Sequence, residues 1–90
     1  MMSIIRAATA GTDTSGDALV SVSPASEGLH LQISSVFYAQ FSRSIEKTAR
    51  ELLAVLGVQN AEVAIDDHGA MDWVLRARIE AAVLRGREAE

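Results

Sequence analysis

Residues 29–34 read Leu-His-Leu-Gln-Ile-Ser, and this strict alternation of apolar and polar side chains decides the fold class. Successive side chains of an extended chain point to opposite faces, so Leu29, Leu31 and Ile33 share one face of a strand. Such alternation is typical of a sheet that buries one face and exposes the other to solvent. The stretch therefore predicts a β-sheet with a single covered face.

A second strand is predicted just before the first, over residues 18–23, where Val20 and Val22 alternate with serines. Residues 24–28, which contain the one proline of the chain, have the composition of a turn. We therefore expect these two strands to form a hairpin. Residues 3–8 are compatible with an additional N-terminal strand.

Two amphipathic helices are predicted in the second half of the chain. Apolar residues recur every three or four positions over residues 37–56, with Ser35 placed to cap the start and Gly57 the end. A second stripe of the same period covers residues 71–83. Between the helices, residues 58–65 return to a period of two and predict another strand.

This order of elements, ββαβα, predicts an α+β protein in the form of a two-layer sandwich. Each helix has one apolar stripe, and both stripes need the apolar face of the same small sheet to cover them. We therefore expect three to four strands with two helices on one face. A chain of 90 residues, 49% hydrophobic, is too short for two cores, so residues 1–90 are expected to form one domain.

The composition excludes several classes of function. The chain has no cysteine, which removes disulfides, thiolate nucleophiles and cysteine-based zinc sites. A net charge of −4 and an aromatic content of 4% leave neither a basic surface nor stacking platforms for nucleic acid. The sequence shows no signal-peptide pattern and no apolar run near the ~18 residues of a membrane helix, so we expect no membrane partner and a cytoplasmic protein.

Residues 10–17, Ala-Gly-Thr-Asp-Thr-Ser-Gly-Asp, are small, polar and turn-forming, and they predict a flexible, exposed loop. In its triplet Ser15-Gly16-Asp17 a hydroxyl stands beside a flexible glycine and a carboxylate. A serine that accepts a bulky group needs this exposure and backbone freedom. The same triplet is also ordinary turn composition, so from chemistry alone both interpretations stay open.

Two catalytic or metal-binding interpretations are weaker. A hydrolytic triad of Ser15 with His30 or His68 lacks the Gly-x-Ser-x-Gly pattern, and the histidines fit a solvent-facing strand position and a turn. Asp66, Asp67, His68 and Asp72 could suggest a divalent cation, but their spacing is not that of a calcium loop. We expect no metal, because carboxylates at a helix start satisfy free N–H groups there.

The second helix carries the remaining candidate contacts. Trp73 lies beside its apolar stripe, where it either packs at the helix–sheet edge or contacts a partner subunit. Arginines 76, 78, 85 and 87 favourably oppose the negative end of the helix dipole. With eight basic residues in all, the composition disfavours a role on a phosphate backbone, while contacts to a partner or to a phosphorylated prosthetic group stay open.

Several segments, in order along nearly the whole chain, form a recognisable set: Ala10-Gly11-Thr12, Ser15-Gly16-Asp17, Leu31-Gln32-Ile33-Ser34-Ser35, Gln40-Phe41, Asp66-Asp67-His68-Gly69-Ala70-Met71-Asp72 and Leu75-Arg76-Ala77-Arg78-Ile79-Glu80-Ala81. Together they resemble the acyl carrier subunit (gamma chain) of citrate lyase. The malonate decarboxylase acyl carrier is similar around Ser-Gly-Asp and more loosely in the second half. Fatty-acid carriers are all-helical with an Asp-Ser-Leu triplet, which this chain lacks.

The resemblance implies a non-catalytic carrier subunit of a multi-subunit complex, a phosphoprotein in the sense that its arm is joined through a phosphodiester. A prosthetic-group transferase would attach 2'-(5''-phosphoribosyl)-3'-dephospho-CoA to Ser15. The thiol of this phosphopantetheine-type arm would carry acetyl or citryl thioesters. The transferase (alpha) subunit would exchange acetyl for citryl, and the lyase (beta) subunit would release oxaloacetate.

Around Ser15 the resemblance also assigns roles to two neighbours. Gly16 would give room beside the bulky group. Asp17 would orient the Ser15 hydroxyl or be recognised by the attaching enzyme, or else serve only as a turn residue. Two other functions stay open: a malonate decarboxylase carrier, and a non-covalent interaction module that uses Trp73 or a sheet edge.

Overall fold

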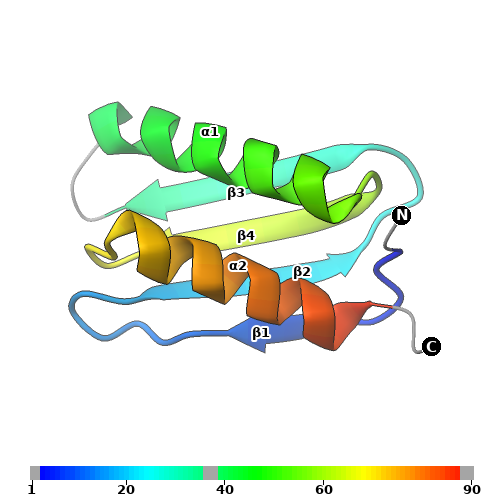
Figure 1. Ribbon diagram of the computed structural model, residues 1–90, viewed down its shortest axis with the longest axis horizontal. Coiled ribbons are helices and arrows are strands. Elements are labelled where there is room, and N and C mark those ends of the chain that lie inside the picture. The colour runs from blue at the N-terminus through cyan, green and yellow to red at the C-terminus, as the bar shows by residue number, and fades with distance from the viewer. Residues whose placement is uncertain (1–2, 36–38, 88–90) are drawn as a thin grey trace.

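Figure 1 shows the computed structural model, which describes residues 3–35 and 39–87. One four-stranded sheet forms one layer, and both helices cover the same face of it. The predicted two-layer α+β sandwich, with the additional N-terminal strand, is therefore confirmed. The elements are β1 (Ala8–Ala10), β2 (Ala18–Pro24), β3 (Leu29–Ser35), α1 (Ala39–Leu56), β4 (Ala61–Asp67) and α2 (Asp72–Gly86).

The strands follow the order β1-β2-β4-β3, so the predicted hairpin between β2 and β3 is wrong. Strand β4 lies between them, antiparallel to β2 and parallel to β3, and Ile65 pairs with Val20 on one side and with Ile33 on the other. The start of β4 is hydrogen-bonded to the connection that follows β2, since the N–H of Ala61 donates to the Gly28 carbonyl at 3.1 Å. Alternation predicts which face a strand buries, but not which strand lies beside it.

The additional strand is β1, Ala8–Ala10, which overlaps the predicted residues 3–8 only at Ala8. The residues before β1 are instead hydrogen-bonded to the C-terminal end of α2. The N–H groups of Ile5 and Arg6 donate to the carbonyl of Gly86 at 2.9 and 3.3 Å. The two ends of the described chain therefore meet beside β1 and β2, as Figure 1 shows.

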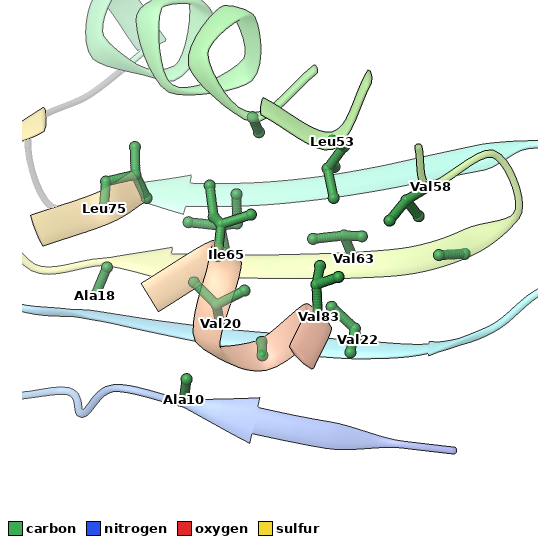
Figure 2. Close-up of a cluster of buried hydrophobic side chains, with 14 of the residues drawn as sticks. Ala10, Ala18, Val20, Val22, Leu53, Val58, Val63, Ile65, Leu75 and Val83 are labelled. Atoms are coloured by element: carbon green, nitrogen blue, oxygen red, sulfur yellow. The ribbon is translucent and has the colours of Figure 1, made fainter. Parts of the chain in front are cut away.

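The core lies between the sheet and the helices (Figure 2). Val20, Val22, Val63 and Ile65 point from the sheet toward Leu53 of α1 and toward α2. Burying these side chains supplies the main driving force for folding. The side chains contributed by α2 are Leu75, Ile79, Ala82 and Val83.

Some predicted members of the helical stripes lie outside this core. Met71 is 67% exposed because it precedes the helix in extended backbone rather than forming its first turn. Phe41 is 47% exposed, and Phe37 lies outside the described residues. The apolar period extends beyond the part of each helix that contacts the sheet.

The end of α1 agrees with the prediction from Gly57. This residue has φ +77°, which glycine adopts without the steric cost of a side chain. Its N–H donates to Ala54, and the N–H of Val58 donates to Leu53 at 2.9 Å, the bond pattern of a Schellman motif. Ser35, predicted as the cap at the other end, is the last residue of β3, and its hydroxyl donates to Asp67.

Leu53→Ala should lower the free energy of unfolding by about 2 to 5 kcal/mol, because it removes a fully buried side chain and leaves a cavity. The matched control is Val55→Ala on the same helix, where the side chain is 82% exposed and a change within about 0.5 kcal/mol is expected. Urea unfolding followed by circular dichroism measures both. Equal losses in the two variants would contradict the assigned core.

Candidate attachment site

The loop between β1 and β2 presents Ser15 at the end of the sheet where β4 meets α2 (Figure 1). Residues 14–17 form a turn in which the N–H of Asp17 donates to the carbonyl of Thr14 at 3.0 Å. Ser15 is exposed, and Gly16, at φ +86°, occupies the turn position that favours glycine. In residues 3–35 and 39–87, the Ser15 hydroxyl has no hydrogen-bond partner.

The Asp17 carboxylate organises this loop. Its Oδ2 accepts hydrogen bonds from the backbone N–H and the hydroxyl of Thr12, at 3.1 and 2.8 Å. Its Oδ1 accepts the N–H of Ala18 at 2.8 Å. Thr12 in turn accepts the N–H of Thr14. Both carboxylate oxygens are therefore engaged with the base of the loop, and Asp17 does not orient the Ser15 hydroxyl directly.

Arg78 of α2 joins the loop to the helix. Its Nε donates to Oδ1 of Asp17 at 2.8 Å, and its Nη2 donates to Oδ2 at 3.3 Å. The Arg78 guanidinium, followed by Thr12, holds the pKa of Asp17 well below its ordinary value of 3.8. The carboxylate therefore stays ionised at neutral pH, and its charge is neutralised by Arg78.

The backbone of His68 holds the other side of the loop. Its carbonyl accepts the N–H of Gly16 at 2.7 Å, and its N–H donates to the carbonyl of Asp17 at 2.9 Å. These bonds continue the ladder between β2 and β4 past the pair Ala18–Asp67. Of the predicted loop of residues 10–17, residues 12–16 are exposed, whereas Ala10 is buried as the last residue of β1. Hydrogen bonds join this loop to two segments distant in sequence, His68 and α2.

Gly11 is needed where the loop leaves β1. A Cβ at this position would stand 1.8 Å from the carbonyl oxygen of Ala18 and 3.1 Å from Cδ of Arg78. By contrast, a Cβ on Gly16 would meet nothing within 4 Å. Gly11 therefore allows the two ends of the loop to approach each other, whereas Gly16 leaves open space beside Ser15.

The residues of the candidate triad do not come together. The Nε2 of His68 pairs with Oδ2 of Asp66 at 3.0 Å, and this bond lowers the pKa of Asp66. His30 bonds to the carbonyl of Glu27, near the start of β3. The start of β3 and the loop between β1 and β2 lie at opposite ends of the sheet (Figure 1). Neither ring bonds to Ser15 within the described residues.

The acidic residues around α2 have separate partners. In the part of the chain that the structure describes, no group of three or more His, Cys, Asp or Glu residues could hold a metal ion. Asp67 accepts the N–H of Ala70, which lies before α2, so this bond holds the turn that leads into the helix rather than a free N–H group of the helix. Asp72 instead accepts Thr48 and Arg76, so its predicted role in satisfying helix N–H groups is wrong. Its bond to Arg76 lowers the pKa of Asp72.

Trp73 is 70% exposed, so packing at the helix–sheet edge does not account for it. The arginines of α2 differ in what they contact: Arg78 reaches Asp17, Arg76 pairs with Asp72 on its own helix, and Arg85 donates to the carbonyl of Thr9. Within the described residues, no helix is long and apolar enough to cross a membrane.

Comparison with known proteins identifies the class. A family model of acyl carrier proteins, described as the malonate decarboxylase delta subunit (MdcD), matches residues 5–86. A chain in the crystal structure of a Pseudomonas malonate decarboxylase hetero-tetramer in complex with malonate is also similar. It superposes with a TM-score of 0.70 at 26% identity, over 89% of this chain and 82% of that one. The fold is therefore that of an acyl carrier protein built as an α+β sandwich.

Curated relatives show to which family of acyl carrier proteins the chain belongs. The citrate lyase acyl carrier protein of Escherichia fergusonii is 51% identical over 97% of this chain and 91% of its own length. That of Klebsiella pneumoniae is 48% identical over 90% of this chain and 84% of its own length. The chain belongs to the family of citrate lyase acyl carrier proteins.

Gly11→Ala should destabilise the protein more than Gly16→Ala, although both glycines have positive φ. Both substitutions carry a left-handed backbone cost of about 1 to 2 kcal/mol, but Gly11→Ala adds the clash with the Ala18 carbonyl. Urea unfolding of the two variants isolates this difference. Equal destabilisation would show that the close approach at Gly11 is not a constraint.

Asp17→Asn should lower stability at pH 7 and have less effect in acid. Because the pKa of Asp17 is depressed in the folded state, its stabilisation is present above the ordinary value of 3.8 and is lost as the pH falls below it. Asp66 and Asp72 titrate in both proteins, so the difference between wild type and variant isolates Asp17. Urea unfolding at pH 7 and pH 3 tests this, and a difference independent of pH would count against it.

Proposed function

We propose that this chain is the covalent acyl carrier subunit of a citrate lyase complex, with Ser15 as the attachment residue. In this proposal a prosthetic-group transferase joins a phosphoribosyl-dephospho-CoA arm to the Ser15 hydroxyl through a phosphodiester. The carrier then serves a transferase (alpha) subunit and a lyase (beta) subunit during cleavage of citrate to oxaloacetate and acetate. When bound, the arm supplies the thiol on which the acetyl and citryl groups travel.

The surroundings of Ser15 carry the proposal. Its hydroxyl is exposed at a turn and has no hydrogen-bond partner in the described residues, so modification breaks no bond seen there. A Cβ added at Gly16 would have no atom within 4 Å, and this open space beside Ser15 leaves room for a bulky substituent. The base of the turn is fixed by hydrogen bonds of Asp17, His68 and Arg78. The residues present therefore fit a covalently attached group.

The same surroundings favour a carrier over a catalyst. A serine nucleophile requires a general base within hydrogen-bond reach. The rings of His30 and His68 are engaged elsewhere, and the Asp17 carboxylate is saturated by other donors. An attachment residue needs no such base, because the modifying enzyme brings its own chemistry.

A malonate decarboxylase carrier is the second candidate. The family model and the structural match both name malonate decarboxylase. The curated relatives at 51% and 48% identity are citrate lyase carriers, against 26% for the chain in the malonate decarboxylase structure. This difference in similarity favours citrate lyase.

Intact-mass measurement of protein made together with its native modifying enzymes tests the attachment. We expect the wild type to gain the mass of one phosphoribosyl-dephospho-CoA group and Ser15→Ala to gain none. Two matched controls, Thr14→Ala in the same turn and Ser26→Ala in another exposed turn, should be modified like the wild type. An unmodified wild type would refute the attachment and favour a non-covalent module. An adduct that survives Ser15→Ala would refute Ser15 as the attachment residue.

Reconstitution separates the two carriers. With its partner subunits, the modified protein should support release of oxaloacetate from citrate and no release of CO₂ from malonate. The opposite result would assign the chain to malonate decarboxylase. The unmodified Ser15→Ala protein is the control for both reactions.

A further inference from the structure

We propose that Arg78 is a positioning residue for the modification of Ser15, acting through Asp17 from a helix 61 residues away in sequence. This inference rests on the proposed function, since it concerns how the attachment turn is presented to the modifying enzyme. Nothing in the Ser-Gly-Asp triplet itself identifies Arg78.

The geometry joins three segments at one point. The guanidinium of Arg78 donates to both oxygens of Asp17, at 2.8 and 3.3 Å. Its aliphatic stem lies over Gly11, where an added Cβ would stand 3.1 Å from Cδ of Arg78. Oδ2 of Asp17 also binds Thr12 near the start of the loop. Arg78 therefore closes the base of a loop that has Ser15 near its apex.

Because the base of the loop is already fixed, binding of the modifying enzyme costs less conformational entropy. An enzyme that modifies a loose loop must order it on binding, and fixing its backbone dihedral angles costs conformational entropy. Here the hydrogen bonds of Asp17 and His68 fix the turn before the enzyme arrives. The effect of losing Arg78 should therefore fall on binding of the carrier rather than on the chemical step.

The ion pair also changes the charge that an incoming donor meets. A donor that delivers a phosphorylated group is anionic, and an unpaired carboxylate two residues from the acceptor hydroxyl would repel it. Asp17 is 14% exposed at its side chain and paired, so its charge is offset by Arg78. The other acidic residue of this loop, Asp13, is exposed.

Arg76 provides a matched control on the same helix. It pairs with Asp72 at 2.7 Å, as short as the Arg78–Asp17 contact, and its side chain is 43% exposed against 42% for Arg78. Its partner lies one helical turn away, so this pair joins no loop. Arg76→Gln removes the same charge from α2 without releasing the attachment turn.

The test measures the rate at which the prosthetic-group transferase modifies wild type, Arg78→Gln and Arg76→Gln, by intact mass at a series of carrier concentrations. For Arg78→Gln we expect the KM for the carrier to rise about fivefold, as loss of a pair worth about 1 kcal/mol gives, with kcat little changed. Arg76→Gln should match the wild type. Arg78→Lys, which keeps the charge but not the forked geometry, should recover part of the loss.

Amide hydrogen exchange separates positioning from general destabilisation. In Arg78→Gln the N–H of Gly16, which donates to His68, should exchange faster, while the core amides of β4 keep their protection. Equal KM values for the two Gln variants, or loss of protection throughout the sheet, would overturn the positioning role. A wild type that is not modified at all would instead refute the proposed function, so the two failures are distinguishable.

Discussion

The presentation of Ser15 depends on the Asp17 carboxylate, which the loop shares with helix α2. One oxygen binds Ala18 and Arg78, and the other binds Thr12 and Arg78. A charge-assisted bidentate contact has both strength and a defined geometry, so it fixes the loop relative to the helix. The loop can therefore be exposed at its apex without being loose at its base. For the proposed carrier function, this places Ser15, the proposed attachment residue, on a defined support.

The rest of the fold brings these partners together. Strand β4 lies at the centre of the sheet, next to β2, and its end brings His68 beside Gly16 and Asp17. Helix α2 follows at once and packs across β1 and β2, which places Arg78 over the loop that joins those two strands. The core residues of α2, among them Ile79, fix this packing. The sheet order and the packing of α2 therefore bring together the residues that fix the loop between β1 and β2.

The sequence was sufficient for the features that depend on local pattern. Alternation in residues 29–34 and the helical stripes predicted the elements and the layers, and Gly57 predicted the end of α1. Sheet order was not predictable in this way, since β2 and β3 read as neighbours until β4 is placed between them. The Asp17–Arg78 pair was hidden for the same reason: nothing local connects residues so far apart. The positions of Gly11 and Arg78 in the segments that resemble citrate lyase carriers were the available signal.

The most direct test of the account is to locate the modification within the native complex. Tandem mass spectrometry of the peptide that contains residues 11–17 should find the phosphodiester-linked arm on Ser15 and leave Thr12 and Thr14 unmodified. An arm on another residue, or an unmodified peptide from an active complex, would contradict the claim that this fold exists to present Ser15.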